Sequence, residues 1–123
     1  SKATPTISVI IAIRGGEKSL PNLLADLSAQ DYSGEIEFIL VDDESTDSTS
    51  KLIQEKSGVD KRFILENSSN GDQSLSHKKR GLDAGIQRAK NEWLLFTDVD
   101  CRLNLGWVNG MAAYFEDDVD YVV

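Results

Sequence analysis

Residues 92–102 read Glu-Trp-Leu-Leu-Phe-Thr-Asp-Val-Asp-Cys-Arg, an apolar run followed by two acids one residue apart. The apolar run predicts a buried strand that delivers both acids to its carboxyl end. In an open α/β sheet this end of a strand is where ligands bind. In an extended segment Asp98 and Asp100 leave the backbone on the same side, so both can coordinate one hard cation. The competing interpretation is an acidic turn that only ends a strand.

Strands and helices alternate along the rest of the chain. Residues 6–13 and 36–41 are apolar runs without polar alternation, which is typical of parallel strands covered on both faces, and residues 62–65 predict a short third strand. Between them, apolar residues at helical spacing predict one helix that starts near Ser19 and a second that ends near Gly58.

The second half of the chain continues this pattern. Residues 76–90 predict a helix whose buried stripe is Leu82, Ile86 and Ala89, and residues 103–115 predict another helix. Residues 120–123 begin a further strand. The alternation predicts an α/β fold with a mostly parallel sheet and right-handed crossovers, formed by one domain over residues 1–123.

Composition limits the possible partners. The chain has 123 residues, 40% of them hydrophobic, and carries 21 acids against 13 bases for a net charge of −8. This balance argues against a surface for nucleic acid or anionic membranes. Cys101 is the only cysteine, which predicts a reducing compartment. Without a signal-peptide layout or a run of about 20 apolar residues, the segment itself is expected to be soluble.

Charged residues follow three of the predicted strands. Arg14 follows the first, Asp42 and Asp43 follow the second, and Asp98 with Asp100 follows the fourth. The glycines after the first strand do not form the Gly-x-Gly-x-x-Gly turn of a dinucleotide site, and a Walker loop is absent. The set fits a nucleoside diphosphate held through a divalent ion, with one carboxylate for the base or ribose, two for the metal and a cation for the phosphates.

A cluster of three basic residues begins the helix predicted at residues 76–90, and consists of Lys78, Lys79 and Arg80. Cations at a helix N-terminus oppose the helix dipole at a cost of a few tenths of a kcal/mol or more. The cluster therefore suggests an anionic ligand at this place. A solvated basic helix end is an equally simple interpretation.

Four motifs together resemble the nucleotide-binding half of an inverting family 2 glycosyltransferase with the GT-A fold. The resemblance covers nearly the whole chain, and the motifs stand in the family's order on the expected elements. They are Ile7 to Arg14 with Glu17, Val41 to Asp47, Lys78 with Leu82 to Ile86, and Thr97 to Cys101.

The resemblance implies a donor site for a nucleotide-diphosphate sugar, most simply a UDP-sugar, with Mn²⁺ or Mg²⁺ as cofactor and a saccharide or lipid-linked acceptor. By position, the resemblance implies that Ala12, Ile13 and Arg14 lie beside the base and that Asp43, with Asp42 next to it, contacts the base and ribose. Lys78 would lie near the phosphates and Asp98 at the ribose. Asp98 and Asp100 would bind the metal.

The sequence departs from the family pattern at Ala12, where proline is usual, and at Gly15, where asparagine is usual. The family's general base lies beyond the next strand, so it is expected after Val123, and no catalytic base is assigned within these residues. Asp117, Asp118 and Asp120 precede that strand and are not candidates. We expect this segment to bind nucleotide without catalysing transfer.

The resemblance also implies features of the parent protein. It should continue with an acceptor-side segment that carries an Asp or Glu, and the Asp-x-Asp-Cys motif suggests C-terminal membrane helices after that segment. The active site would then lie in the cytoplasm, at the cytoplasmic face of the membrane.

Two other functions fit part of the pattern. A signalling receiver domain also alternates strands and helices over about 120 residues. It needs an acid pair after the first strand and a phospho-accepting Asp after the third, where this chain has Arg14 and Asn67. A family member that binds a sugar nucleotide or a partner without turnover is the second alternative, which a missing carboxylate base in the full-length protein would favour.

Overall fold

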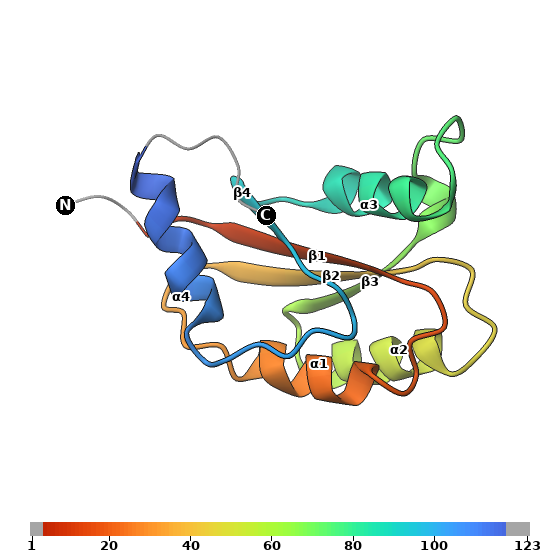
Figure 1. The fold of residues 1–123 in the computed structure, drawn as a ribbon, viewed down its shortest axis with the longest axis horizontal. Helices are drawn as coiled ribbons and strands as arrows, with labels where there is room; N and C mark the ends of the chain where they lie inside the picture. The colour runs from red at the N-terminus through yellow and green to blue at the C-terminus, as the bar shows by residue number, and fades with distance from the viewer. Residues whose placement is uncertain (1–3, 118–123) are drawn as a thin grey trace.

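The computed structural model describes residues 4–117, so the strand predicted at 120–123 and the acids Asp118 and Asp120 lie outside the described residues. Figure 1 shows the fold. In chain order its elements are β1 (Ile7–Ile13), α1 (Leu20–Ser28), β2 (Ile36–Asp42), α2 (Thr49–Val59), β3 (Phe63–Asn67), the 3-10 turn η1 (Ser68–Asn70), α3 (His77–Arg88), β4 (Trp93–Phe96), α4 (Trp107–Ala112) and η2 (Ala113–Asp117).

The four strands form one parallel sheet in the order β3-β2-β1-β4. The first strand is central, as its β-branched apolar sequence predicts, and it pairs with β2 from Ile7↔Ile36 to Ile13↔Asp42. On its other side it pairs with β4 as far as Ile10↔Phe96. All carboxyl ends therefore point the same way, toward the right in Figure 1. This brings together the loops that carry the predicted site.

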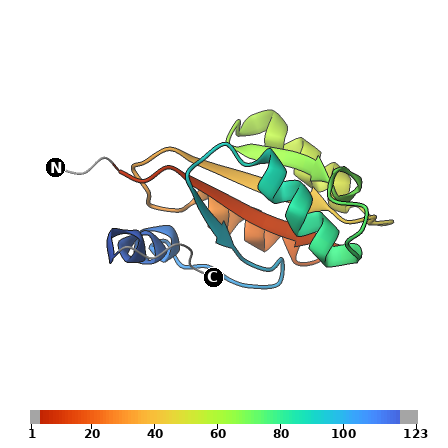
Figure 2. The ribbon, with the colours of Figure 1, turned by 90° about the horizontal axis from the view of Figure 1, so that it is seen from above.

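Helices cover both faces of the sheet. Helices α1 and α2 lie on one face and α3 lies on the other, as Figures 1 and 2 show. Isoleucines of β1 alternate between the two cores: Ile11 and Ile13 pack with the α1 leucines, whereas Ile10 packs with Ala84 of α3. Within residues 4–117, no helix combines the length and apolar character that a membrane crossing needs.

The predicted buried stripe of α3 is wrong at Ile86, whereas Leu82 and Ala89 are half-buried and pack against the core as expected. The helix faces the sheet with its small residues Gly81, Ala84 and Gly85, while Ile86 is 44% exposed. A Cβ on Gly85 would lie 2.5 Å from Ile10 Cγ2, so only glycine allows α3 to approach β1 this closely. Leu82 and Ile86 also line a hollow of about 430 Å³ together with Phe96 and Thr97.

Two further expectations need correction. Strand β4 is only half-buried apart from Leu95, because it is the last strand on its side of the sheet among the described residues. The helix expected from residue 103 begins at Trp107. Residues 101–106 have no helical structure, and Leu105 is 62% exposed instead of buried.

Candidate functional site

A cleft of about 460 Å³ opens at the carboxyl edge of the sheet, between the start of α3 and the loops after β1, β2 and β4. Its lining combines charges of both signs. The lining residues are Ala12, Arg14, Asp43, His77, Lys78, Asp98, Val99 and Asp100. The fold therefore brings together residues that the sequence separates by up to 88 positions, from Ala12 to Asp100.

One wall of the cleft is formed by Arg14 and Asp43. The Arg14 guanidinium donates from Nε to the backbone oxygen of Asp43 at 3.1 Å and from Nη2 to Glu44 Oε2 at 2.7 Å. The carboxylate of Asp43 is 7% exposed and lies 4.0 Å from Arg14 Nε. Among residues 4–117 this carboxylate has the Arg14 ion pair but accepts no hydrogen bond, so its oxygens can accept from a ligand.

Ile13 and Asp42 do not line the cleft. Ile13 points into the core with no exposed surface, and its backbone oxygen accepts from the Asp43 amide at 2.8 Å. Asp42 is 8% exposed, and its Oδ1 accepts from the Ser45 amide at 3.1 Å. Both residues shape the two loops, and any role beside the base would come from the Ile13 backbone.

The opposite wall is a tight turn over residues 98–101, closed by the Cys101 amide donating to the Asp98 carbonyl at 3.2 Å. The extended segment predicted here is wrong, because β4 already ends at Phe96. The turn nevertheless gathers the acids: ligand atoms of Asp98, Asp100 and Cys101 all lie within 4.8 Å of one another. The exposed carboxylate oxygens suit a hard cation such as Mg²⁺ or Mn²⁺ that keeps other positions for water and phosphate.

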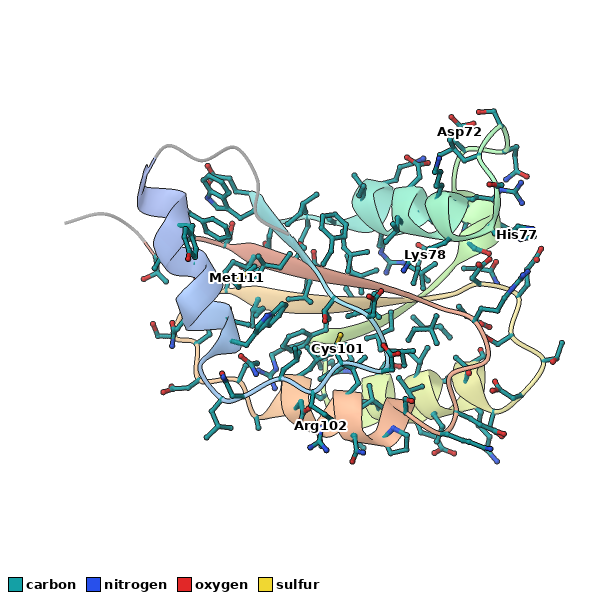
Figure 3. The ribbon with its side chains drawn as sticks, viewed as in Figure 1. Asp72, His77, Lys78, Cys101, Arg102 and Met111 are labelled. Atoms are coloured by element: carbon teal, nitrogen blue, oxygen red, sulfur yellow. The ribbon has the colours of Figure 1, made fainter. Side chains whose placement is uncertain are left out.

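Lys78 connects α3 to this turn. Its Nζ lies 2.9 Å from Asp98 Oδ1, and both side chains are more than half exposed. An exposed ion pair of this kind contributes at most about 1 kcal/mol, so an anionic ligand and its cation can separate the two groups at small cost. Figure 3 shows His77 and Lys78 together at the start of α3.

The segment after the turn is anchored to α1. Arg102 donates from Nε to Asp26 Oδ2 at 2.8 Å, and the Leu103 amide donates to the same oxygen at 3.0 Å. The hydrogen bond from Arg102, followed by that from Leu103, holds the pKa of Asp26 below its usual value. These contacts fix the acidic turn against the body of the fold.

Sequence reasoning missed two lining residues, His77 and Val99. Val99 stands between the two acids and packs under the loop after β1, where a Cβ on Gly16 would lie 3.1 Å from Val99 Cγ2. His77 is the first residue of α3 and has a φ of 33°. Its position next to Lys78 is the only feature of the sequence that could have indicated His77 as a lining residue.

Known proteins share the sequence motifs and the fold of this chain. A family model described as glycosyl transferase family 2 matches residues 8–123. The chain belongs to that family. Among curated family 2 relatives, a 4,4'-diaponeurosporenoate glycosyltransferase of Staphylococcus haemolyticus is 35% identical over 103 residues, which is 84% of this chain and 26% of that protein.

Solved structures of glycosyltransferases share the fold. The Staphylococcus aureus TarS fragment 1–349 in complex with UDP is 29% identical and superposes with a TM-score of 0.69, covering 91% of this chain and 32% of that one. The mannosyltransferase PcManGT of Pyrobaculum calidifontis, solved with GDP-Man and Mn²⁺, is 22% identical with a TM-score of 0.68, covering 82% of this chain and 29% of that one. The predicted GT-A fold class is confirmed.

The family 2 chain described here is much shorter than its relatives. It spans about a quarter to a third of the length of the glycosyltransferases cited above, 26% of the curated relative and 32% of the TarS fragment.

Proposed function

We propose that this chain is the donor-binding part of an inverting glycosyltransferase that uses a divalent cation and a nucleotide-diphosphate sugar, with uridine as the preferred base. The cleft carries the proposal, because the Arg14–Asp43 pair lines one wall while two carboxylates and a lysine line the other. Support comes from TarS, which was solved with UDP, and from PcManGT, which was solved with Mn²⁺.

The two walls would hold different parts of the donor. Asp43 would accept hydrogen bonds from the base or ribose, with Arg14 beside it and the small Ala12 leaving room for the ring. Lys78 would leave Asp98 and donate to the diphosphate, because a lysine ammonium is a compact point charge that binds phosphate well. Asp98 and Asp100 would hold Mn²⁺ or Mg²⁺ through oxygen ligands.

In the whole protein the reaction would be a direct displacement at the anomeric carbon. The bond from that carbon to the diphosphate oxygen breaks as the acceptor oxygen bonds to the opposite face, and the acceptor proton passes to a carboxylate. We place that carboxylate beyond residue 123, with the acceptor site. Lys78 would stabilise the charge on the departing diphosphate, and a cation held by Asp98 and Asp100 would supply further charge neutralisation.

Calorimetry of this chain with UDP tests the proposal. We expect UDP to bind more tightly with Mn²⁺ than with a chelator, because the two acids repel a diphosphate unless a cation lies between them. Mixing these 123 residues with a UDP-sugar and acceptor should give no transfer. A folded chain with equal UDP affinity in both buffers would contradict the metal site.

A further inference from the structure

Three successive backbone amides directly after Arg14 are all occupied by side chains of the neighbouring loop. We name this set of hydrogen bonds the loop clamp. Its members are Gly15 N to Ser45 Oγ at 2.9 Å, Gly16 N to Thr49 Oγ1 at 2.9 Å and Glu17 N to Asp47 Oδ2 at 3.3 Å.

The clamp is reinforced from both sides. A hydrogen bond also runs in the opposite direction between the two loops, because Glu17 Oε2 accepts from the Ser48 amide at 3.0 Å. Asp47 Oδ1 accepts from the Thr49 hydroxyl at 2.6 Å and from the Thr49 amide at 2.9 Å. These hydrogen bonds hold the pKa of Asp47 below its usual value, and the bond from the Thr49 hydroxyl has the largest effect. Thr49 itself is fully buried at the start of α2.

The loop clamp occupies the backbone amides that bind phosphate in many other α/β proteins. In glycine-rich loops after the first strand, free amides at the start of the next helix cradle an anion. Here the amides of residues 15–17 already donate to two hydroxyls and the Asp47 carboxylate. A diphosphate would have to displace a carboxylate that is part of the fold. The phosphates are therefore directed to the other wall, where Lys78 lies.

The same hydrogen bonds fix the base-side wall. The ladder between β1 and β2 ends at Ile13↔Asp42, just before Arg14 and Asp43. Beyond that point the two loops diverge, and Gly15 with φ of 63° gives the first loop a backbone that few other residues adopt. The half-exposed Arg14 side chain holds Asp43 and Glu44 through its own hydrogen bonds, and the clamp adds a backbone restraint that sets where Arg14 starts relative to Asp43.

We propose that Ser45, Asp47 and Thr49 are positioning residues, which set the distance between Arg14 and Asp43 and thereby the fit of the nucleobase. This inference rests on the proposed function. None of the three residues lines the cleft. They are predicted to control base affinity more than phosphate and metal binding, because the turn at residues 98–101, although Val99 contacts the loop at Gly16, is also anchored through Asp26.

Thr49→Val tests the inference, because it keeps the shape of the side chain and removes the hydroxyl that joins Gly16 to Asp47. Thr46→Val is the matched control, since Thr46 is exposed in the same loop and its side chain makes no hydrogen bond among residues 4–117. Calorimetry would compare UDP with pyrophosphate, both with Mn²⁺. We expect Thr49→Val to weaken UDP about ten-fold, as for one lost hydrogen bond, and pyrophosphate by less than about two-fold.

Hydrogen exchange of the ligand-free chain gives an independent readout. The Gly16 amide should exchange at least about ten-fold faster in Thr49→Val than in Thr46→Val, because its acceptor is gone. If Thr49→Val does not fold, Asp47→Ala is the second test, because it removes the acceptor of the Glu17 amide. It should likewise weaken UDP binding more than pyrophosphate binding.

The outcomes separate the inference from the proposed function. If the unsubstituted chain binds no UDP with Mn²⁺, the proposed function fails and the inference falls with it. If the unsubstituted chain binds UDP but the substitution weakens UDP and pyrophosphate equally, or changes neither, the proposed function stands and the positioning role is overturned.

Discussion

Asp100→Asn is expected to remove the metal dependence of UDP binding. The amide keeps the size of the side chain but loses the charge that a divalent cation requires, and only Asp98 would remain as a carboxylate ligand in the turn. Loss of even an outer-shell partner of a metal costs about 10–100-fold in affinity, so we expect at least about ten-fold weaker UDP binding in Mn²⁺. Calorimetry with and without chelator measures the effect.

Glu55→Gln is the matched control for this change. It removes one negative charge from the exposed surface of α2, on the face of the sheet opposite α3. UDP binding in this variant should keep its full dependence on Mn²⁺. An equal loss in both variants would show that net charge, not coordination, controls the affinity. Unchanged metal dependence in Asp100→Asn would place the cation elsewhere.

Asp43→Ala is expected to weaken uridine nucleotides by about 1–3 kcal/mol, because a buried ligand donor would lose its acceptor. Binding of pyrophosphate with Mn²⁺ should hardly change, since the two acids of the turn lie on the other wall of the cleft. Calorimetry with both ligands makes the comparison within one protein, and thermal unfolding checks that the variant folds.

The pair of ligands makes the Asp43 experiment decisive. Equal weakening of UDP and pyrophosphate would mean that Asp43 serves the metal or the fold. No weakening of either ligand would mean that the base is recognised by other groups, and the assignment of the wall formed by Arg14 and Asp43 would be wrong.

The sequence was sufficient to predict the sheet and the edge at which the candidate cleft opens. Unbroken apolar runs such as residues 7–13 form central parallel strands because both faces are covered, and parallel strands place all their carboxyl ends at one edge. Charged residues directly after such runs, as at Arg14, Asp43 and Asp98, must then converge.

The face of α3 could not be predicted in this way. Periodicity assigns the largest apolar residues to the core, yet the sheet surface here is already filled by Ile10 and Val41. The small residues of α3 make the closest approach to them, so Gly85 is buried, Leu82 stays half-buried and Ile86 turns outward. Helix propensity and hydrophobic pattern do not say how much space the side chains of the sheet leave for those of the helix.

The loop clamp was also beyond sequence reasoning. Residues 45–49 are rich in serine, threonine and aspartate, which equally predict helix caps. No side chain caps α2 at Ser48, and three side chains of this segment bond to the neighbouring loop instead. Which backbone amides a polar side chain meets depends on the distance between two loops, and that distance is set by the sheet.

The central claim is that one cleft holds a nucleoside diphosphate with its base at Asp43 and its cation at Asp98 and Asp100. Nuclear magnetic resonance of the ¹⁵N-labelled chain with UDP tests it most directly. With Mg²⁺, amide shifts should concentrate at Ala12, Arg14 and Asp43. With trace Mn²⁺, paramagnetic broadening should be strongest over residues 98–101 and at Lys78, and a chelator should reverse it. Broadening spread evenly over exposed acids such as Glu55, or shifts outside the cleft, would contradict the account.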